Sequence, residues 1–177
     1  MRVITGSARG MKLVTLDGDA TRPTREAVKE AVFSMIQFET EGARVLDLFA
    51  GSGQMGIEAL SRGASHCVFC DNSSAAAKIV KQNLVHTGLI GKATLICTDY
   101  TQALKSGTFD IAFVDPPYSQ GYIDKVLPIL TPRMSEGGVI ICESDINDKL
   151  PDEVGGFCKT TVKKYVRNII TVYRYIK

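Results

Sequence analysis

The chain has 177 residues, of which 45% are hydrophobic and 23% charged, and its formal net charge is +2. Such values are typical of a single soluble globular domain, and they exclude a highly charged disordered chain. Neither a secretory leader pattern nor an apolar run of membrane-spanning length is present, so we expect a cytoplasmic protein.

The charge is unevenly distributed along the chain. Residues 1–29 carry a balance of +3 and residues 159–177 one of +6, whereas the segment between them carries −7. Two basic ends around an acidic centre suit a polyanionic partner such as nucleic acid, although solvated strand and helix faces would give the same pattern. The candidates for such contacts include Arg25, Lys163, Lys164 and Arg167.

The first 40 residues predict a small extension before the main domain. Short apolar runs at 2–5 and 11–16 flank a turn-forming segment, which indicates a β-hairpin. A helix follows with Thr24 as its expected cap, because apolar residues recur at helical spacing at Val28, Ala31, Val32, Met35 and Ile36. We therefore divide a single domain, 1–177, into a hairpin-and-helix extension at 1–40 and a core at 41–177.

Strand and helix patterns alternate through the core. Near-continuous apolar runs predict strands at 44–49, 66–70, 94–97, 109–114 and 138–142, separated by helices at 54–62, 73–86 and about 121–130. Two consecutive strands, 158–164 and 168–176, end the chain as a hairpin. The fold class is thus α/β, a doubly wound Rossmann-like sheet that is mostly parallel and carries a C-terminal antiparallel hairpin.

Cys67 and Cys70 form a C-x-x-C pattern inside one of these strands. Residues i and i+3 of a strand point to opposite faces, so the two thiols cannot converge on a metal or form a redox pair. The five cysteines are also too scattered for a disulfide framework. We interpret them as core residues and expect no metal.

Ligands of doubly wound sheets bind beyond the carboxyl ends of the strands, and four predicted strands end there in acidic corners. The first corner contains a G-x-G-x-x-G pattern at Gly51, Gly53 and Gly56, which lets a ligand approach the start of a helix. Asp71 ends the next strand, where a carboxylate can accept hydrogen bonds from ribose hydroxyls. Together they indicate a ligand that contains adenosine, with a pyrophosphate or a carboxylate at the loop.

Asp47 favours S-adenosylmethionine over a dinucleotide. A carboxylate before the loop repels phosphate but suits a ligand ammonium, although it would also serve as an acceptor for loop amides. Asp99 could accept the adenine amine, and Gly56 is assigned to helix packing. The predicted cofactor residues are Asp47, Phe49, Gly51, Gly53, Asp71, Asn72, Asp99 and Tyr100.

The fourth corner reads Asp115-Pro116-Pro117-Tyr118. An exocyclic amine is a poor nucleophile until its lone pair is localised, and two acceptors aimed at its N–H bonds, the Asp115 carboxylate and the Pro116 carbonyl, favour this. The prolines stiffen the turn, and Tyr118 offers a ring for stacking a base. We predict these four residues as the catalytic group for transfer of a methyl group to a base amine, with the base flipped into the site.

DLFAGSG at 47–53, DPPY at 115–118 and TRPT at 21–24 together resemble the RsmD-type family of ribosomal RNA methyltransferases, over essentially the whole chain. The resemblance implies methylation of a guanine N2 amine in small-subunit (16S) ribosomal RNA with S-adenosylmethionine, on a ribonucleoprotein particle. It also implies RNA contacts by Arg9, Lys12 and Arg22.

Other activities remain open at the level of sequence. A DNA adenine-N6 or cytosine-N4 methyltransferase shares DPPY but generally needs an additional target-recognition region. A methyltransferase for protein glutamine or a small amine leaves the basic ends unexplained. A nucleotide-binding module or an NAD-dependent oxidoreductase would leave DPPY without a role.

Overall fold

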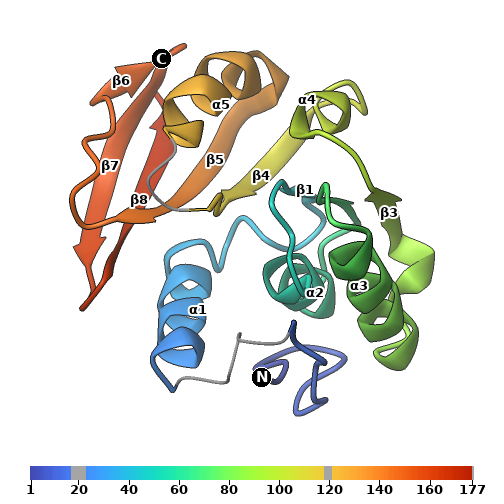
Figure 1. Cartoon of the computed structure of the whole chain (residues 1–177). Helices are drawn as coiled ribbons and strands as arrows, with labels where there is room; N and C mark the ends of the chain where they lie inside the picture. The colour runs from blue at the N-terminus through green and yellow to red at the C-terminus, as the bar shows by residue number, and fades with distance from the viewer. Residues whose placement is uncertain (17–22, 118–120, 177) are drawn as a thin grey trace.

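The computed structural model describes residues 1–16, 23–117 and 121–176, and for residues 23–25 the backbone alone. Its core is one eight-stranded sheet in the order β3-β2-β1-β4-β5-β8-β7-β6. The strands β1 to β5 run parallel, whereas β5, β8, β7 and β6 pair antiparallel. The predicted fold class is therefore confirmed (Figure 1).

Most elements lie close to their predicted ranges, but the strand predicted at 138–142 extends over Met134–Asp145, and the short helix Tyr100–Ala103 and the strand Glu153–Val154 were not predicted. The helices are α1 Pro23–Met35, α2 Gln54–Ser61, α3 Ser74–His86, α4 Tyr100–Ala103 and α5 Tyr122–Leu130. The strands are β1 Arg44–Asp47, β2 His66–Cys70, β3 Ala93–Ile96, β4 Phe109–Val114, β5 Met134–Asp145, β6 Glu153–Val154, β7 Phe157–Lys164 and β8 Asn168–Tyr175. Pro23 opens α1, so the predicted cap at Thr24 is wrong; proline suits a first helical position, where the N–H would have no partner.

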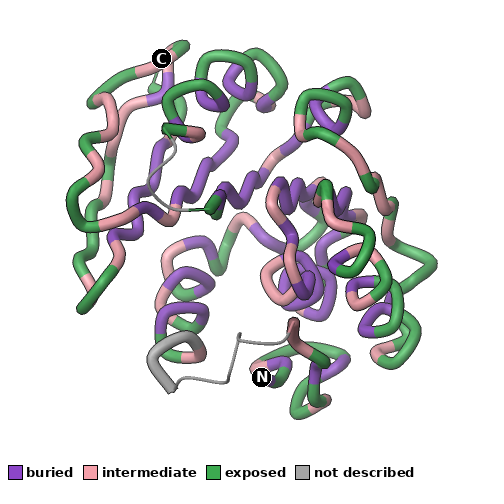
Figure 2. The backbone as a smooth tube through the Cα atoms, viewed as in Figure 1, coloured by how far each residue is buried: buried purple, intermediate pink, exposed green. Residues whose placement is uncertain are grey.

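Two apolar layers cover the two faces of the sheet. The N-terminal segment, α1, α2 and α3 pack on one face, and α4 and α5 pack on the other (Figures 1 and 2). Side chains alternate between the layers, so Cys67 belongs to the first cluster and Cys70 to the second. The expectation that these thiols diverge is confirmed. No helix in the described ranges is long and apolar enough to cross a bilayer.

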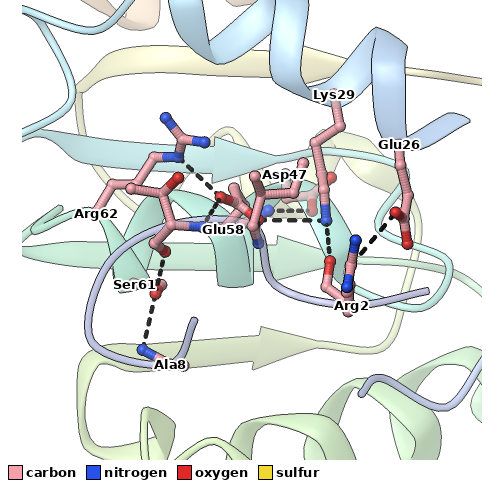
Figure 3. A network of polar contacts seen from close by, with 11 residues as sticks. Arg2, Ala8, Glu26, Lys29, Asp47, Glu58, Ser61 and Arg62 are labelled. Carbon is pink, nitrogen blue, oxygen red and sulfur yellow. Dashed lines mark hydrogen bonds and ion pairs between the residues drawn. The ribbon is translucent and has the colours of Figure 1, made fainter. Parts of the chain in front are cut away.

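The predicted N-terminal hairpin is reduced to one antiparallel bridge between Arg2 and Lys12. The amides of Ile4 and Thr5 do not continue the ladder, because they donate to the two carboxylate oxygens of Glu58, at 2.9 and 3.0 Å. Further along, the Ala8 amide donates to the Ser61 hydroxyl at 3.0 Å. The segment is thus held on α2 rather than extended as two strands (Figure 3).

Glu58 also joins α1 to α2 through buried charge. The carboxylate is fully buried and lies 3.2 Å from Lys29 Nζ, whose side chain is 1% exposed, and 2.8 Å from Arg62 Nε. Lys29 Nζ donates in addition to the Arg2 carbonyl at 2.7 Å. Such a cluster tolerates burial because each charge is paired and hydrogen-bonded (Figure 3).

Replacing Glu58 with Ala leaves Lys29 buried without its counter-charge and two backbone amides without acceptors. We expect the free energy of unfolding to fall by about 3–5 kcal/mol in urea titrations. Glu30→Ala, at an exposed position of α1, is the control and should change it by less than about 0.5 kcal/mol. Equal effects of the two changes would contradict this role of Glu58.

Candidate functional site

The parallel register brings the ends of neighbouring strands to one edge of the sheet. Asp47 is paired with Phe69 of β2 and Phe113 of β4, and Val114 is paired with Cys142 of β5. The corners after β1, β2, β3 and β4 consequently surround one cavity of about 370 Å³, which we call the rim cavity. Its lining includes Phe49, Gly51, Gln54, Asp71, Asn72, Asp99, Tyr100, Asp115, Pro116, Pro117 and Tyr122.

The glycine loop forms a tight turn that Asp71 holds from the side. Gly51 and Gly53 have φ angles of 55° and 77°, in the left-handed region that glycine tolerates, and Gly53 caps α2. The Asp71 carboxylate accepts from Gly51 N and from Ser73 N, each at 2.9 Å. A carboxylate has about four acceptor positions, so Asp71 keeps capacity for ligand hydroxyls in the cavity that it lines.

Asp47 lies beneath this loop and is absent from the cavity lining. Its side chain is 4% exposed, and its Oδ2 accepts from Gly56 N at 3.0 Å. Burial raises the pKa of this carboxyl to about 7, against the opposing effect of the Gly56 hydrogen bond. This placement matches the alternative considered for Asp47, an acceptor for loop amides.

Gly56, the third glycine of the pattern, is a packing residue. A Cβ atom there would lie 2.3 Å from Phe69 Cε1 and 2.7 Å from Cys67 Sγ. The glycine lets α2 approach β2, and its assignment to helix packing is confirmed. Gly53 likewise does not line the rim cavity, because it serves the turn that starts α2.

Three aromatic rings form one wall of the rim cavity. Phe49 lies 5.7 Å from Tyr100 and 5.8 Å from Tyr122, measured between ring centroids. Tyr122 was not among the predicted residues, although it follows DPPY closely and comes directly after Gly121, the cap of α5. Asp99 is exposed beside this wall, where its carboxylate accepts from Thr101 N at 2.9 Å; its hydrogen bonds with Thr101 lower its pKa.

A second cavity of about 320 Å³ adjoins the first, and we call it the hairpin cavity. It lies between α1 and the β7–β8 turn, and most of its lining is apolar: Val28, Val32, Met55, Phe113, Val114, Ile141, Val166 and Ile170, with Lys29, Gln54, Asp115, Glu143, Arg167 and Asn168. Asp115 and Gln54 line both cavities. Gln54 Oε1 is buried and accepts no hydrogen bond from the described residues.

The predicted catalytic corner is therefore placed between two cavities. Asp115 and Pro117 are exposed at this junction, while Pro116 is buried. Tyr118 lies outside the described residues. No cluster of three or more His, Cys, Asp or Glu side chains within 1–16, 23–117 and 121–176 is arranged to hold a metal.

The basic candidates divide into two groups. Arg9 and Lys12 are exposed on the N-terminal segment, and Lys163, Lys164 and Arg167 are exposed around the β7–β8 turn. Only Arg167 of these lines the hairpin cavity. Arg22 and the side chain of Arg25 lie outside the described residues. Part of the terminal charge is neutralised locally, since Lys29 pairs with Glu58, Lys159 with Asp152 and Arg174 with Glu39.

Asp47→Asn keeps an oxygen acceptor for the Gly56 amide but removes the titration. Burial raises the pKa of the folded carboxyl from 3.8 to about 7, so between these values the folded chain holds a proton that the unfolded chain releases. The stabilising contribution is complete below about pH 4 and is lost as the pH rises to about 7.

The stability of Asp47→Asn relative to the wild type should accordingly rise by a few kcal/mol from pH 4 to 7, at about 1.4 kcal/mol per pKa unit, and then stay level. Urea titrations across this range measure the difference. Asp124→Asn, at an exposed carboxylate, is the control. A difference for Asp47→Asn that does not change with pH would contradict the raised pKa.

The comparisons with known proteins agree with this geometry. The family described as "Conserved hypothetical protein 95" matches residues 1–174. "Putative rRNA methyltransferase YlbH" of Bacillus subtilis is 39% identical, with 98% of each chain covered. "Ribosomal RNA small subunit methyltransferase D" of Escherichia coli is 32% identical, over 85% of this chain and 78% of that one.

Among solved structures, "Putative methyltransferase yhhF from Escherichia coli" superposes with a TM-score of 0.88 and 29% identity, covering 99% of this chain and 97% of that one. The family matched along almost the full sequence is the one that DLFAGSG, DPPY and TRPT indicated. The chain belongs to the RsmD/YlbH family of S-adenosylmethionine-dependent ribosomal RNA methyltransferases.

Proposed function

We propose that this protein transfers a methyl group from S-adenosylmethionine to the N2 amine of a guanine in small-subunit (16S) ribosomal RNA. The observation that carries the proposal is the position of Asp115, on the wall shared by the rim cavity and the hairpin cavity. One cavity suits an adenosine-bearing ligand and the other a planar apolar one, so Asp115 borders the region where donor and acceptor would meet. The relatives named small subunit methyltransferase D support the choice of RNA.

The lining of the rim cavity supports S-adenosylmethionine as its ligand, because it offers acceptors and apolar rings. Asp71 would accept from the ribose hydroxyls, and Asp99 with Asn72 would lie toward the adenine. The rings of Phe49, Tyr100 and Tyr122 would cover its apolar faces. When bound, this cofactor supplies a methyl group on a positively charged sulfur. Asp47 would contribute indirectly, because its carboxylate holds the glycine loop through the Gly56 amide.

Asp115 and Pro116 would act on the target amine. The Asp115 carboxylate and the Pro116 carbonyl would accept its two N–H bonds, which localises the nitrogen lone pair toward the methyl group. The carboxylate would also take up the proton that the amine loses after transfer. Positioning and proton acceptance of this kind contribute roughly 10²–10⁴-fold to a rate.

The base would reach Asp115 through the hairpin cavity, after leaving its helix or loop. The apolar lining from α1, β4, β5 and β8 suits the faces of a flat base, and Tyr118 would add a stacking ring from the corner itself. The extension 1–40 would contact RNA through Arg9, Lys12, Arg22 and Arg25, and the β7–β8 turn through Lys163, Lys164 and Arg167. An assembled ribonucleoprotein particle as substrate would place the protein in the cytoplasm.

Asp115→Ala tests the assignment of the acceptor. Methyl transfer to small ribosomal subunits should fall by about 10²–10⁴-fold in kcat, because the amine loses its proton acceptor. Affinity for S-adenosylhomocysteine should stay within a few-fold, since Asp71 and the aromatic wall are unchanged. Asp124→Ala, at an exposed position of α5, should leave both quantities unaltered. If the variant instead lost affinity for the cofactor and kept its kcat, Asp115 would serve the cofactor and not the target amine.

A separate prediction concerns the basic turn. Changing Lys163, Lys164 and Arg167 together to Ala should flatten the plot of log affinity for RNA against log salt by about 2, because each phosphate of single-stranded RNA that a cation neutralises adds roughly 0.7 to the slope. The matched control changes three lysines that are exposed elsewhere, Lys78, Lys81 and Lys92. The same slope in wild type and in the first variant would show that the turn is solvated rather than bound to RNA.

A further inference from the structure

Glu143 stands beside the proposed acceptor for the target amine. Val114 and Cys142 are paired in the parallel β4–β5 register, so the residues that follow them, Asp115 and Glu143, come next to each other at the rim. Both line the hairpin cavity. Two carboxylates thus border the same small space, and the chemistry at Asp115 requires only one.

The orientation of Glu143 is fixed from the antiparallel side of the sheet. Asn168 begins β8 opposite Asp145, and its Nδ2 donates to Glu143 Oε1. Asn168 lines the hairpin cavity as well. A carboxylate held in this way is a positioned acceptor, which differs from a mobile surface charge.

The ammonium of Lys29, which lines the same cavity, is engaged elsewhere. Lys29 Nζ lies 3.2 Å from Glu58 and donates to the Arg2 carbonyl. Its charge is therefore matched inside the first apolar layer. The hairpin cavity therefore carries the acceptors Asp115 and Glu143, together with Asn168 and Arg167, in an otherwise apolar wall.

We infer that Glu143 selects guanine by accepting a hydrogen bond from its N1–H while Asp115 accepts from the adjacent N2 amine. Guanine presents N1–H and the N2 amine side by side, whereas adenine and cytosine place a ring nitrogen acceptor beside their amines. A second carboxylate therefore attracts guanine and repels the lone pair of the other bases. This inference rests on the proposed function and adds the group that reads the base.

2-Aminopurine separates recognition from chemistry, because it keeps the N2 amine but has a lone pair at N1. The substrates are small subunits reconstituted from 16S RNA with guanine or 2-aminopurine at the methylated nucleotide. The measured quantity is the ratio of kcat/KM for the two. For the wild type we expect guanine to be preferred by roughly tenfold to a hundredfold.

Glu143→Gln should remove or reverse this preference. With its carbonyl kept on Asn168, the glutamine would turn its NH₂ group toward N1, which opposes the N1–H of guanine and matches the lone pair of 2-aminopurine. Glu136→Gln, exposed near the other end of β5, is the matched control and should keep the wild-type ratio. Thermal unfolding and S-adenosylhomocysteine affinity report whether the variants are folded.

The outcomes separate the inference from the proposed function. A wild-type enzyme that methylates guanine and 2-aminopurine equally well overturns the inference without any variant. So does a folded Glu143→Gln enzyme that keeps the wild-type ratio, and in both cases the guanine N2 activity stands. A wild-type enzyme that leaves guanine N2 unmethylated overturns the proposed function, and the inference with it.

Discussion

The carboxylate of Glu58 joins the N-terminal segment, α1 and α2 to one another. It accepts from the backbone of the N-terminal segment, pairs with Lys29 on α1 and pairs with Arg62 at the end of its own helix. Burying the charges of Lys29 and Glu58 is unfavourable unless each has its partners, so the cluster favours this arrangement of the segment, α1 and α2. Because α1 carries Val28 and Val32 of the hairpin cavity, this interaction also sets the distance across that cavity.

The direction of the strands determines the wall of the hairpin cavity that lies opposite α1. Parallel strands β1 to β5 bring their acidic corners to one rim, and β8 returns antiparallel so that its first residue, Asn168, pairs with Asp145 at the same rim. The β7–β8 turn therefore stands over the end of β5 and opposite α1. The antiparallel return of β8 thus brings the hairpin cavity beside the rim cavity, and the two share Asp115.

Much of this arrangement could be predicted because its signals are local. Apolar runs marked the strands, the order of elements gave the sheet, and strand-end corners gave the lining of the rim cavity from Phe49 to Pro117. The opposite placement of Cys67 and Cys70 followed from the strand period alone.

The remainder depends on contacts between distant segments. Asp47 looked like a ligand group, but only the packing of α2 shows its carboxylate buried on the Gly56 amide. The N-terminal hairpin is shorter than predicted, because the amides of Ile4 and Thr5 donate to Glu58, more than 50 residues away in sequence. Glu143 follows the strand predicted at 138–142, and its position beside Asp115 appears only through the register of β4 and β5.

The central claim is that Asp115 serves a guanine amine of ribosomal RNA, and the direct measurement is transfer of labelled methyl from S-adenosylmethionine. Free 16S RNA, assembled small subunits and duplex DNA are offered in parallel, and the labelled product is digested and identified as a nucleoside. The account predicts N2-methylguanosine from small-subunit substrate and little label in DNA. Label in N6-methyladenine or N4-methylcytosine of DNA, or none in any guanine, would contradict it.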